Sequence, residues 1–366
     1  MVHARRQHSL KASIDRDDIN GLLITNLTNI RYLSGFTGSS AALAFAPQSW
    51  AFFSDGRYTH QAGREVKNAA VHTSSNSPPV QAAQWLGQRF ARRRTPRIAI
   101  EADSVTISTQ KRIDSQLSSC LGRTRYQLVA TSGLVEELRI RKDKPEAKLI
   151  RNAVQLASSI FSRLLTAIKP SATENDVAAE LEYLARRAGA EKMSFDSIVA
   201  SGQNSALPHA RPTRRKIGRG FVVLDYGVIL AGYCSDMTRT VWVGPASGEA
   251  RRIYSAVLEA QLAGIAAVGA GVECQAVDAA ARDVLRKHKL DKYFTHSLGH
   301  GVGLEIHEAP LLAKGQTQKL KPGMVVTIEP GVYIPGKGGV RIEDMVLITK
   351  TGCEVLTPTP KEFLVL

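Results

Sequence analysis

Cysteine is scarce in this chain, and the four cysteines that it has form no pattern. Cys120, Cys234, Cys274 and Cys353 lie far apart, with no CxxC pair and no cysteine–histidine cluster. This spacing argues against a disulfide framework and a thiolate zinc site, and it suits a reducing compartment. Long apolar runs are also missing, so we expect neither a secretion signal nor a membrane anchor. The sequence predicts a cytoplasmic protein with no membrane partner.

Positive charge dominates the composition. The chain has 48 lysines and arginines against 33 aspartates and glutamates, a formal net charge of +15. A basic protein invites a nucleic-acid partner, because clustered cations attract phosphate groups. The basic runs Arg92–Arg94 and Arg214–Lys216 are short, however, and are not interleaved with aromatic residues that could stack on bases. The runs favour solvated loops, and we expect no nucleic-acid partner.

The length favours two domains, because 366 residues exceed one typical domain. From about residue 15 to 130, short apolar runs alternate with helical stretches, which is typical of a small α/β domain. We place the boundary near residue 135, giving domains 1–135 and 136–366. In the second domain, helical spacing covers 145–168, 171–190, 249–270 and 274–288, and strand-like runs cover 221–224, 240–243, 325–328 and 345–348. These runs predict an α+β arrangement of antiparallel strands backed by helices.

Acidic residues stand next to several of these apolar runs. Asp225 ends the run 221–224, and Asp236 follows a turn at Ala231–Gly232, which suits two neighbouring strands of one hairpin. A carboxylate at the end of a buried strand needs a partner. The alternatives to a ligand role are an ion pair with Arg239 and a turn cap at Asp236.

Two further acids and a histidine segment complete a cluster. Glu329 follows the run 325–328, Glu343 enters the run 345–348, and the Gly-rich segment His296–Pro310 presents three histidines. A structural role for all three histidines is the weaker alternative. Four carboxylates around one imidazole would repel one another unless cations neutralise them. The cluster therefore predicts a two-metal centre that activates water.

The runs around these residues resemble a known family. They are similar to the signature of the Xaa-Pro peptidases, aminopeptidase P and prolidase, within the pita-bread metallopeptidases. Tyr32–Ser39 and Asp55–Tyr58 resemble the creatinase-like N-terminal domain. The resemblance implies a creatinase-like α/β domain followed by a pita-bread domain with a curved antiparallel sheet backed by helices. The C-terminal runs that carry it are Leu224–Gly227, Ser235–Thr240, His296–Pro310, Thr327–Tyr333 and Gly339–Asp344.

The resemblance also implies roles for the metal ligands. Two divalent ions are expected, with Mn²⁺ as our expectation and Co²⁺ or Zn²⁺ as alternatives. Asp225 would chelate one ion, and His300 and Glu329 would bind the other. Asp236 and Glu343 would bridge both ions.

The same resemblance implies how the site would act. A hydroxide that bridges the metals would attack the scissile carbonyl, and Glu329 would move the proton. His307 would contact the substrate, and His209 would stabilise the developing oxyanion. His296 would line the pocket, and Arg341 would orient the carboxylate of Glu343 without binding the metals itself.

The resemblance implies substrates with proline at the second position, and a homodimer. Prolidase cleaves dipeptides and must bind the free carboxylate of proline, whereas aminopeptidase P accepts longer peptides. Many prolidase-like sequences carry a basic residue after the His-Glu-x-Pro motif, where this chain has Leu311 and Leu312. A desolvated carboxylate needs a cationic partner. We therefore expect a Xaa-Pro aminopeptidase, with a Xaa-Pro dipeptidase as the alternative and a non-catalytic binding protein on the same fold as a further one.

Overall fold

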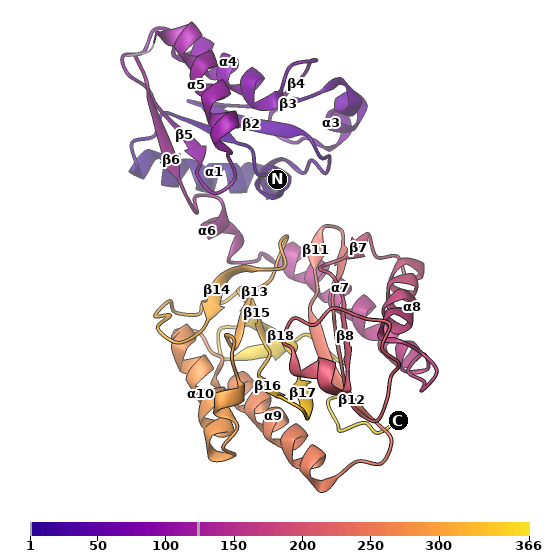
Figure 1. Cartoon of the computed structure of the whole chain (residues 1–366). Coiled ribbons are helices and arrows are strands. Elements are labelled where there is room, and N and C mark those ends of the chain that lie inside the picture. Colours follow the sequence, from indigo (N-terminus) through magenta and orange to yellow (C-terminus); the bar gives the residue numbers. More distant parts are fainter. Residues whose placement is uncertain (1, 123–124) are drawn as a thin grey trace. The chain divides into compact units, whose positions relative to one another are not determined.

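The computed structural model describes residues 2–122 and 125–366, and the chain forms two compact units (Figure 1). Unit 1 is Met1–Arg139 and unit 2 is Ile140–Leu366. The expected domain boundary near residue 135 lies a few residues before this division. Each unit has a hydrophobic core of its own.

Unit 1 is a six-stranded sheet with the strand order β4-β3-β2-β1-β5-β6. β1 pairs antiparallel with β2 and parallel with β5. Leu86 of α4 and Leu117 of α5 are fully buried in a cluster with sheet residues such as Ile98. This architecture confirms the predicted α/β domain. The strands are β1 (Gly21–Ile24), β2 (Ala41–Ala46), β3 (Ser49–Ser54), β4 (Ala70–Thr73), β5 (Arg97–Glu101) and β6 (Gln127–Thr131), and the α-helices are α1 (Val2–Arg16), α2 (Leu27–Ser34), α3 (Thr59–Glu65), α4 (Pro78–Phe90), α5 (Ile107–Leu121) and α6 (Glu136–Arg139).

Two helix pairs cover the sheets of unit 2 (Figure 1). The helices are α7 (Lys144–Leu165), α8 (Glu174–Arg187), α9 (Gly248–Ala267) and α10 (Cys274–Lys287), so all four predicted helices are confirmed. Thr173 caps α8. The Thr173 side chain accepts a hydrogen bond from the backbone N–H of Asp176, whose carboxylate accepts from the backbone N–H of Thr173.

Every strand pair in unit 2 that joins named strands is antiparallel among the described residues. The sheets have the orders β12-β9-β8, β11-β10-β7, β14-β13-β15-β18-β19 and β16-β17. Antiparallel sheets backed by helices agree with the predicted pita-bread fold. The strands are β7 (Lys192–Met193), β8 (Ile198–Ser201), β9 (Gly220–Tyr226), β10 (Val228–Leu230), β11 (Tyr233–Cys234), β12 (Met237–Val243), β13 (Gly299–Gly301), β14 (Glu308–Leu312), β15 (Val325–Ile328), β16 (Gly331–Ile334), β17 (Gly338–Arg341), β18 (Asp344–Ile348) and β19 (Cys353–Val355).

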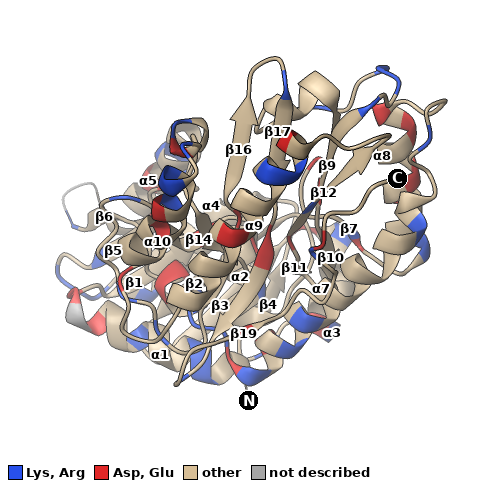
Figure 2. Cartoon of the chain, turned by 90° about the horizontal axis from the view of Figure 1, so that it is seen from below, with Lys and Arg blue, Asp and Glu red and all other residues tan. Residues whose placement is uncertain are grey.

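Charged residues are distributed over many elements of the chain. Figure 2 shows lysines and arginines on separate helices and loops, with acidic residues between them. Among residues 2–122 and 125–366, no helix is long and apolar enough to cross a membrane.

Candidate metal centre

The strand pair β9–β12 places two of the predicted ligands. Asp225 lies opposite Thr238 in this pair, and Asp236 immediately precedes β12. The expected single hairpin is incomplete, because β10 and β11 form a smaller hairpin between the two strands. Its turn, Ala231–Gly232, has positive φ at both residues, 49° and 83°, which suits a tight turn between antiparallel strands.

The strand pair β15–β18 places two more acids at one end of a sheet. Ile328 lies opposite Asp344, so Glu329 directly follows the pair and Glu343 directly precedes it. The backbone N–H of Glu343 donates to the carbonyl of Thr238 at 3.1 Å. This bond joins the end of β18 to β12, and the two strand pairs therefore present their acids to one place.

His300 reaches the same place from the short strand β13, in which a glycine lies on each side of His300. A Cβ on Gly299 would lie 2.0 Å from the carbonyl oxygen of Thr327. Only glycine permits this close approach to β15. The Thr327 hydroxyl accepts a hydrogen bond from the backbone N–H of His300 at 3.1 Å and donates to the carboxylate of Glu329 at 3.0 Å. The sequence indicated the glycines but not the strand, because glycine is depleted in strands.

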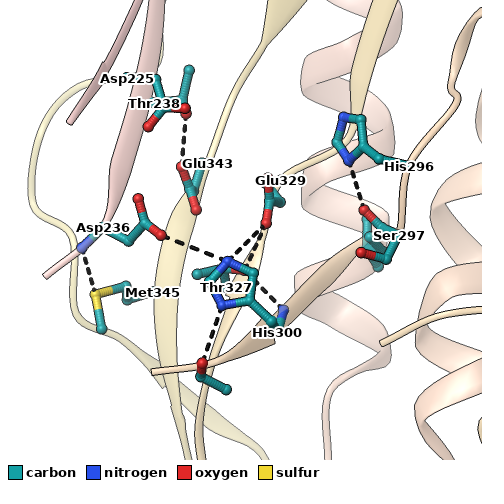
Figure 3. A network of polar contacts seen from close by, with 12 residues as sticks. Asp225, Asp236, Thr238, His296, Ser297, His300, Thr327, Glu329, Glu343 and Met345 are labelled. Carbon is teal, nitrogen blue, oxygen red and sulfur yellow. Dashed lines mark hydrogen bonds and ion pairs between the residues drawn. The ribbon is translucent and has the colours of Figure 1, made fainter. Parts of the chain in front are cut away.

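The side chains converge on the His300 ring (Figure 3). His300 Nε2 lies 3.6 Å from Asp236 Oδ2 and 3.3 Å from Glu329 Oε1. One ligand atom each from Asp236, His300 and Glu343 lies within 4.8 Å of the other two, which is a suitable arrangement for a metal ion. All these groups are buried or nearly so.

Asp225 joins the cluster through Arg341. The Arg341 guanidinium donates from Nη2 to Asp225 Oδ2, and its Nε donates to the hydroxyl of Thr238 at 3.1 Å. That hydroxyl donates to Glu343 Oε2 at 2.7 Å. Arg341 was expected to orient Glu343, and it reaches Glu343 through Thr238 while it binds Asp225 directly. The alternative partner Arg239 binds Asp344 instead, at 2.8 Å.

The close packing of these buried acids shifts their pKa values. Burial, and then the neighbouring carboxylates, raise the pKa of Asp236 and of Glu343 well above their usual range. Glu329 differs: burial would raise its pKa, but the hydrogen bond with His300 and the charges of His300, His296 and Arg341 together outweigh burial and lower the pKa to about 2. Glu343 Oε1 is buried and has no hydrogen-bond partner among the described residues. Buried acids with an orphaned oxygen are the donor set that a divalent cation would satisfy, so the residues fit the predicted metals.

The remaining histidines lie around this cluster. His296 Nε2 and the Tyr333 hydroxyl are hydrogen-bonded at 2.9 Å. The His307 ring meets the His300 ring edge-on, with 4.4 Å between centroids. Burial, and then the charge of His300, lower the pKa of His307. Electrostatic interactions of His209 with both His296 and His307 place His209 near the same group.

Tyr333 and Thr238 are functional candidates that the sequence argument did not select. The Tyr333 hydroxyl accepts from Arg341 Nη1 at 2.6 Å and bonds His296, so it connects two predicted site residues. Both residues lay within the runs that carried the family resemblance. Their signal was a polar group within a buried strand, which is weak until the neighbour of that strand is known.

Two family models match the chain. The creatinase/prolidase N-terminal domain matches residues 6–141, and metallopeptidase family M24 matches residues 148–350. The chain belongs to metallopeptidase family M24. The prediction of a Xaa-Pro peptidase family member with a creatinase-like N-terminal domain is therefore confirmed, and the protein is a metal-dependent peptidase.

Similar proteins include two of known structure that cover nearly all of the chain or all of it. A structure of the Xaa-Pro dipeptidase from Bacillus anthracis has 39% identity and a TM-score of 0.93, and the match covers 100% of both chains. The Xaa-Pro dipeptidase of Pyrococcus furiosus is 46% identical over 232 residues, which are 63% of this chain and 67% of that protein. The X-Pro aminopeptidase structure from Thermotoga maritima has 35% identity and a TM-score of 0.85 over 95% of this chain and 98% of that one.

Proposed function

We propose that this protein hydrolyses the Xaa-Pro bond of dipeptides, as a metal-dependent Xaa-Pro dipeptidase. The observation that carries the proposal is the buried cluster of carboxylates around His300. The names of similar proteins, Xaa-Pro dipeptidases from Bacillus anthracis and Pyrococcus furiosus, support the dipeptide substrate. The proposal of a dipeptidase reverses the expectation from sequence, which favoured the aminopeptidase.

Five residues would hold two divalent ions, with Mn²⁺ as our choice and Co²⁺ or Zn²⁺ as alternatives. Carboxylate oxygens outnumber the single imidazole nitrogen, which suits Mn²⁺. When bound, such ions lower the pKa of water toward neutrality and supply a Lewis acid for the carbonyl oxygen. The proposed ligands are Asp225, Asp236, His300, Glu329 and Glu343.

The protein's own groups would manage the proton and the developing charge. Glu329 stays ionised although it is buried, because its hydrogen bond with His300 and the nearby charges of His300, His296 and Arg341 lower its pKa to about 2. Its carboxylate would take up the proton of the attacking water, whose own pKa the bound ions would lower. The prolyl nitrogen carries no hydrogen in the peptide bond, so it must receive that proton as it leaves. In this proposal His307 and His209 would donate hydrogen bonds to the carbonyl oxygen as it becomes negative.

Arg341 and His296 would organise the pocket rather than react. The Arg341 guanidinium donates to Asp225, to the hydroxyl of Tyr333 and, at 3.1 Å, to the carbonyl of Pro208, the residue before His209. His296 shares the Tyr333 hydroxyl. This network would fix the positions of a metal ligand and of a carbonyl-binding histidine together.

Leu311 favours a second candidate function, a Xaa-Pro aminopeptidase. In the β13–β14 pair it lies opposite His300, and it is 44% exposed, whereas the next residue, Leu312, is fully buried. Its side chain therefore lies on the same face of the sheet as His300. An apolar side chain beside the site offers a proline carboxylate no charge partner, which would suit a longer peptide.

Product analysis separates the two candidates. Metal-stripped protein is reconstituted with Mn²⁺ and incubated with Ala-Pro, Ala-Pro-Ala and Ala-Ala-Ala, beside an unreconstituted control, and products are identified by mass spectrometry. Metal-dependent cleavage of Ala-Pro alone supports the dipeptidase, and release of alanine from Ala-Pro-Ala supports the aminopeptidase. If none of the three peptides is cleaved, both proposals fail. A Leu311→Arg variant should raise kcat/KM for Ala-Pro relative to Ala-Pro-Ala by about ten-fold, because the arginine would bind the free carboxylate of proline.

We also propose a homodimer, on the strength of the family resemblance. The chain has a mass of 39.7 kDa. Light scattering coupled to gel filtration measures whether the particle has one or two times this mass. A single-chain mass over a range of concentrations would rule out a stable dimer.

A further inference from the structure

The connection between His300 and His307 needs a support that the metal centre does not supply. His300 lies in β13 and His307 directly precedes β14, so residues 302–307 join the two strands without regular structure of their own. The two imidazole rings nevertheless meet at 4.4 Å between centroids. Backbone hydrogen bonds hold its first residues: Cys234 donates to the carbonyl of Gly303 at 2.8 Å, and Val302 donates to the carbonyl of Val325 at 3.1 Å. The residues that lead to His307 need a further support, because irregular backbone has many conformations of similar free energy.

The connection folds around the carboxylate of Glu308. Glu308 Oε1 accepts a hydrogen bond from the backbone N–H of Glu305 at 3.1 Å. A Cβ on Gly303 would lie 2.5 Å from the same carboxylate, so any other residue here would push the carboxylate out of this position. The Glu308 side chain is 5% exposed. A buried charge at this point needs a partner of opposite sign.

Lys142 supplies that partner from a distant part of the chain. Its Nζ lies 2.9 Å from Glu308 Oε2, and its side chain is 1% exposed. The backbone N–H of Lys142 donates to the carbonyl of Gly323 at 2.7 Å, which fixes the start of the lysine side chain against the segment that leads into β15. A buried, hydrogen-bonded ion pair has a defined geometry, unlike a pair on the surface.

We propose that Lys142 is a positioning residue that holds His307 against His300 by neutralising and locating the Glu308 carboxylate. Lys142 has no role in binding the metals, and it acts on the site only through Glu308 and the connection 302–307. The consequence for catalysis rests on the proposed role of His307 at the scissile carbonyl. The consequence for the connection itself does not depend on that role.

Hydrogen exchange tests the positioning directly. In full-length Lys142→Met, the peptide covering residues 302–307 should exchange about ten-fold faster than in the wild type, while peptides from α9 and β18 keep their rates. Lys144→Met is the matched control, because Lys144 is exposed in the first turn of α7. Unchanged exchange in residues 302–307 would overturn the proposal. Hydrogen exchange can be measured even if the protein cleaves no Xaa-Pro peptide. Failure of the positioning proposal can therefore be distinguished from failure of the proposed function.

Kinetics test the catalytic consequence. On the peptide that the wild type cleaves, Lys142→Met with restored metal should lose about ten-fold to a hundred-fold in kcat, with KM changed by less than about three-fold. Lys142→Arg should recover most of the loss, because it keeps the charge. A kcat equal to that of the wild type would contradict the proposal.

A double variant separates positioning from general stability. Lys142→Met with Glu308→Gln removes both charges, and the glutamine oxygen can still accept from Glu305. Such a neutral pair should regain the melting temperature lost in Lys142→Met alone. Positioning by the ion pair predicts that kcat stays at least about ten-fold low while the melting temperature recovers. Recovery of both together would show a purely structural role.

Discussion

Glu343 is the acid whose surroundings demand a cation most clearly. Its Oε2 accepts from Thr238, whereas its buried Oε1 has no partner among the described residues. Burial and two nearby carboxylates, Glu329 and Asp225, raise its pKa. A group in this position gains far more from a divalent ion than from any neutral donor.

Removing this acid should abolish activity. Glu343→Ala deletes a proposed bridging ligand, and we expect a loss of at least about a thousand-fold in kcat/KM, with a lower metal content per chain. Metal analysis and peptide cleavage measure the two effects. Glu354→Ala is the control, because Glu354 forms only a partly exposed ion pair with Arg151. Full turnover by a folded Glu343→Ala protein would refute the ligand assignment.

Tyr333 provides a test of the network behind the ligands. Tyr333→Phe removes the hydroxyl that Arg341 and His296 share, and it leaves two polar groups without that partner. We expect about a ten-fold loss of kcat/KM with little change in metal content. Tyr183→Phe is the control, since Tyr183 is 55% exposed. Equal kinetics for the two variants would argue against a functional role for the Tyr333 hydroxyl.

At the scale of elements, the site depends on how closely β13 approaches β15. β13 consists of Gly299, His300 and Gly301, and both glycines face backbone carbonyls that a Cβ would strike. The pairing Gly301 to Val326 brings His300 into line with the acid at the end of β15. Side-chain size at these two positions therefore decides where the imidazole lies.

Gly299→Ala should move β13 away from β15. The added Cβ would lie 2.0 Å from the carbonyl oxygen of Thr327, so the strand must shift, at a cost of about 3 kcal/mol or more in the free energy of unfolding. Urea unfolding measures the loss, and metal titration should show weaker binding through His300. Gly218→Ala is the control, because a Cβ there meets nothing within 4 Å. Similar stability of both variants would show that the strand tolerates the side chain.

For the whole molecule, the metal centre links stability to pH. Asp236 and Glu343 have pKa values raised by burial and by the other carboxylates. Without metal, these groups hold protons more tightly in the folded than in the unfolded state, so their contribution to stability is lost as pH rises above the ordinary carboxylate range. Glu329, with a pKa of about 2, acts in the opposite sense, but only at more acidic pH.

Metal should therefore stabilise the protein more at higher pH. Added Mn²⁺ competes with protons for Asp236 and Glu343, and we expect a larger rise in melting temperature near about pH 8 than near about pH 5.5. Differential scanning fluorimetry at both pH values, with and without the ion, measures the difference. Glu343→Ala should show a smaller rise at both. An equal rise in melting temperature at the two pH values would contradict competition between the metal and protons for these acids.

Much of the architecture followed from local patterns. The spacing of apolar residues determined the four helices of unit 2, and the apolar runs located β9, β12, β15 and β18. These features depend on residues close together in sequence, because a helix or strand with one buried face needs apolar residues at a regular spacing. The acids at the ends of those runs were visible for the same reason, since a charge beside a buried run is unusual.

Other features needed the tertiary structure, because they depend on contacts between residues far apart in sequence. β13 has a sequence typical of a loop and becomes a strand only because β15 lies beside it. Arg239 was an alternative ion-pair partner for Asp225, and packing assigned it to Asp344 instead. The Lys142–Glu308 pair joins positions 166 residues apart. The sequence by itself determined the family, the four helices and four of the strands of unit 2, and the acids. Only the tertiary structure decided which side chains meet, because long-range packing and burial select among partners that are chemically equivalent.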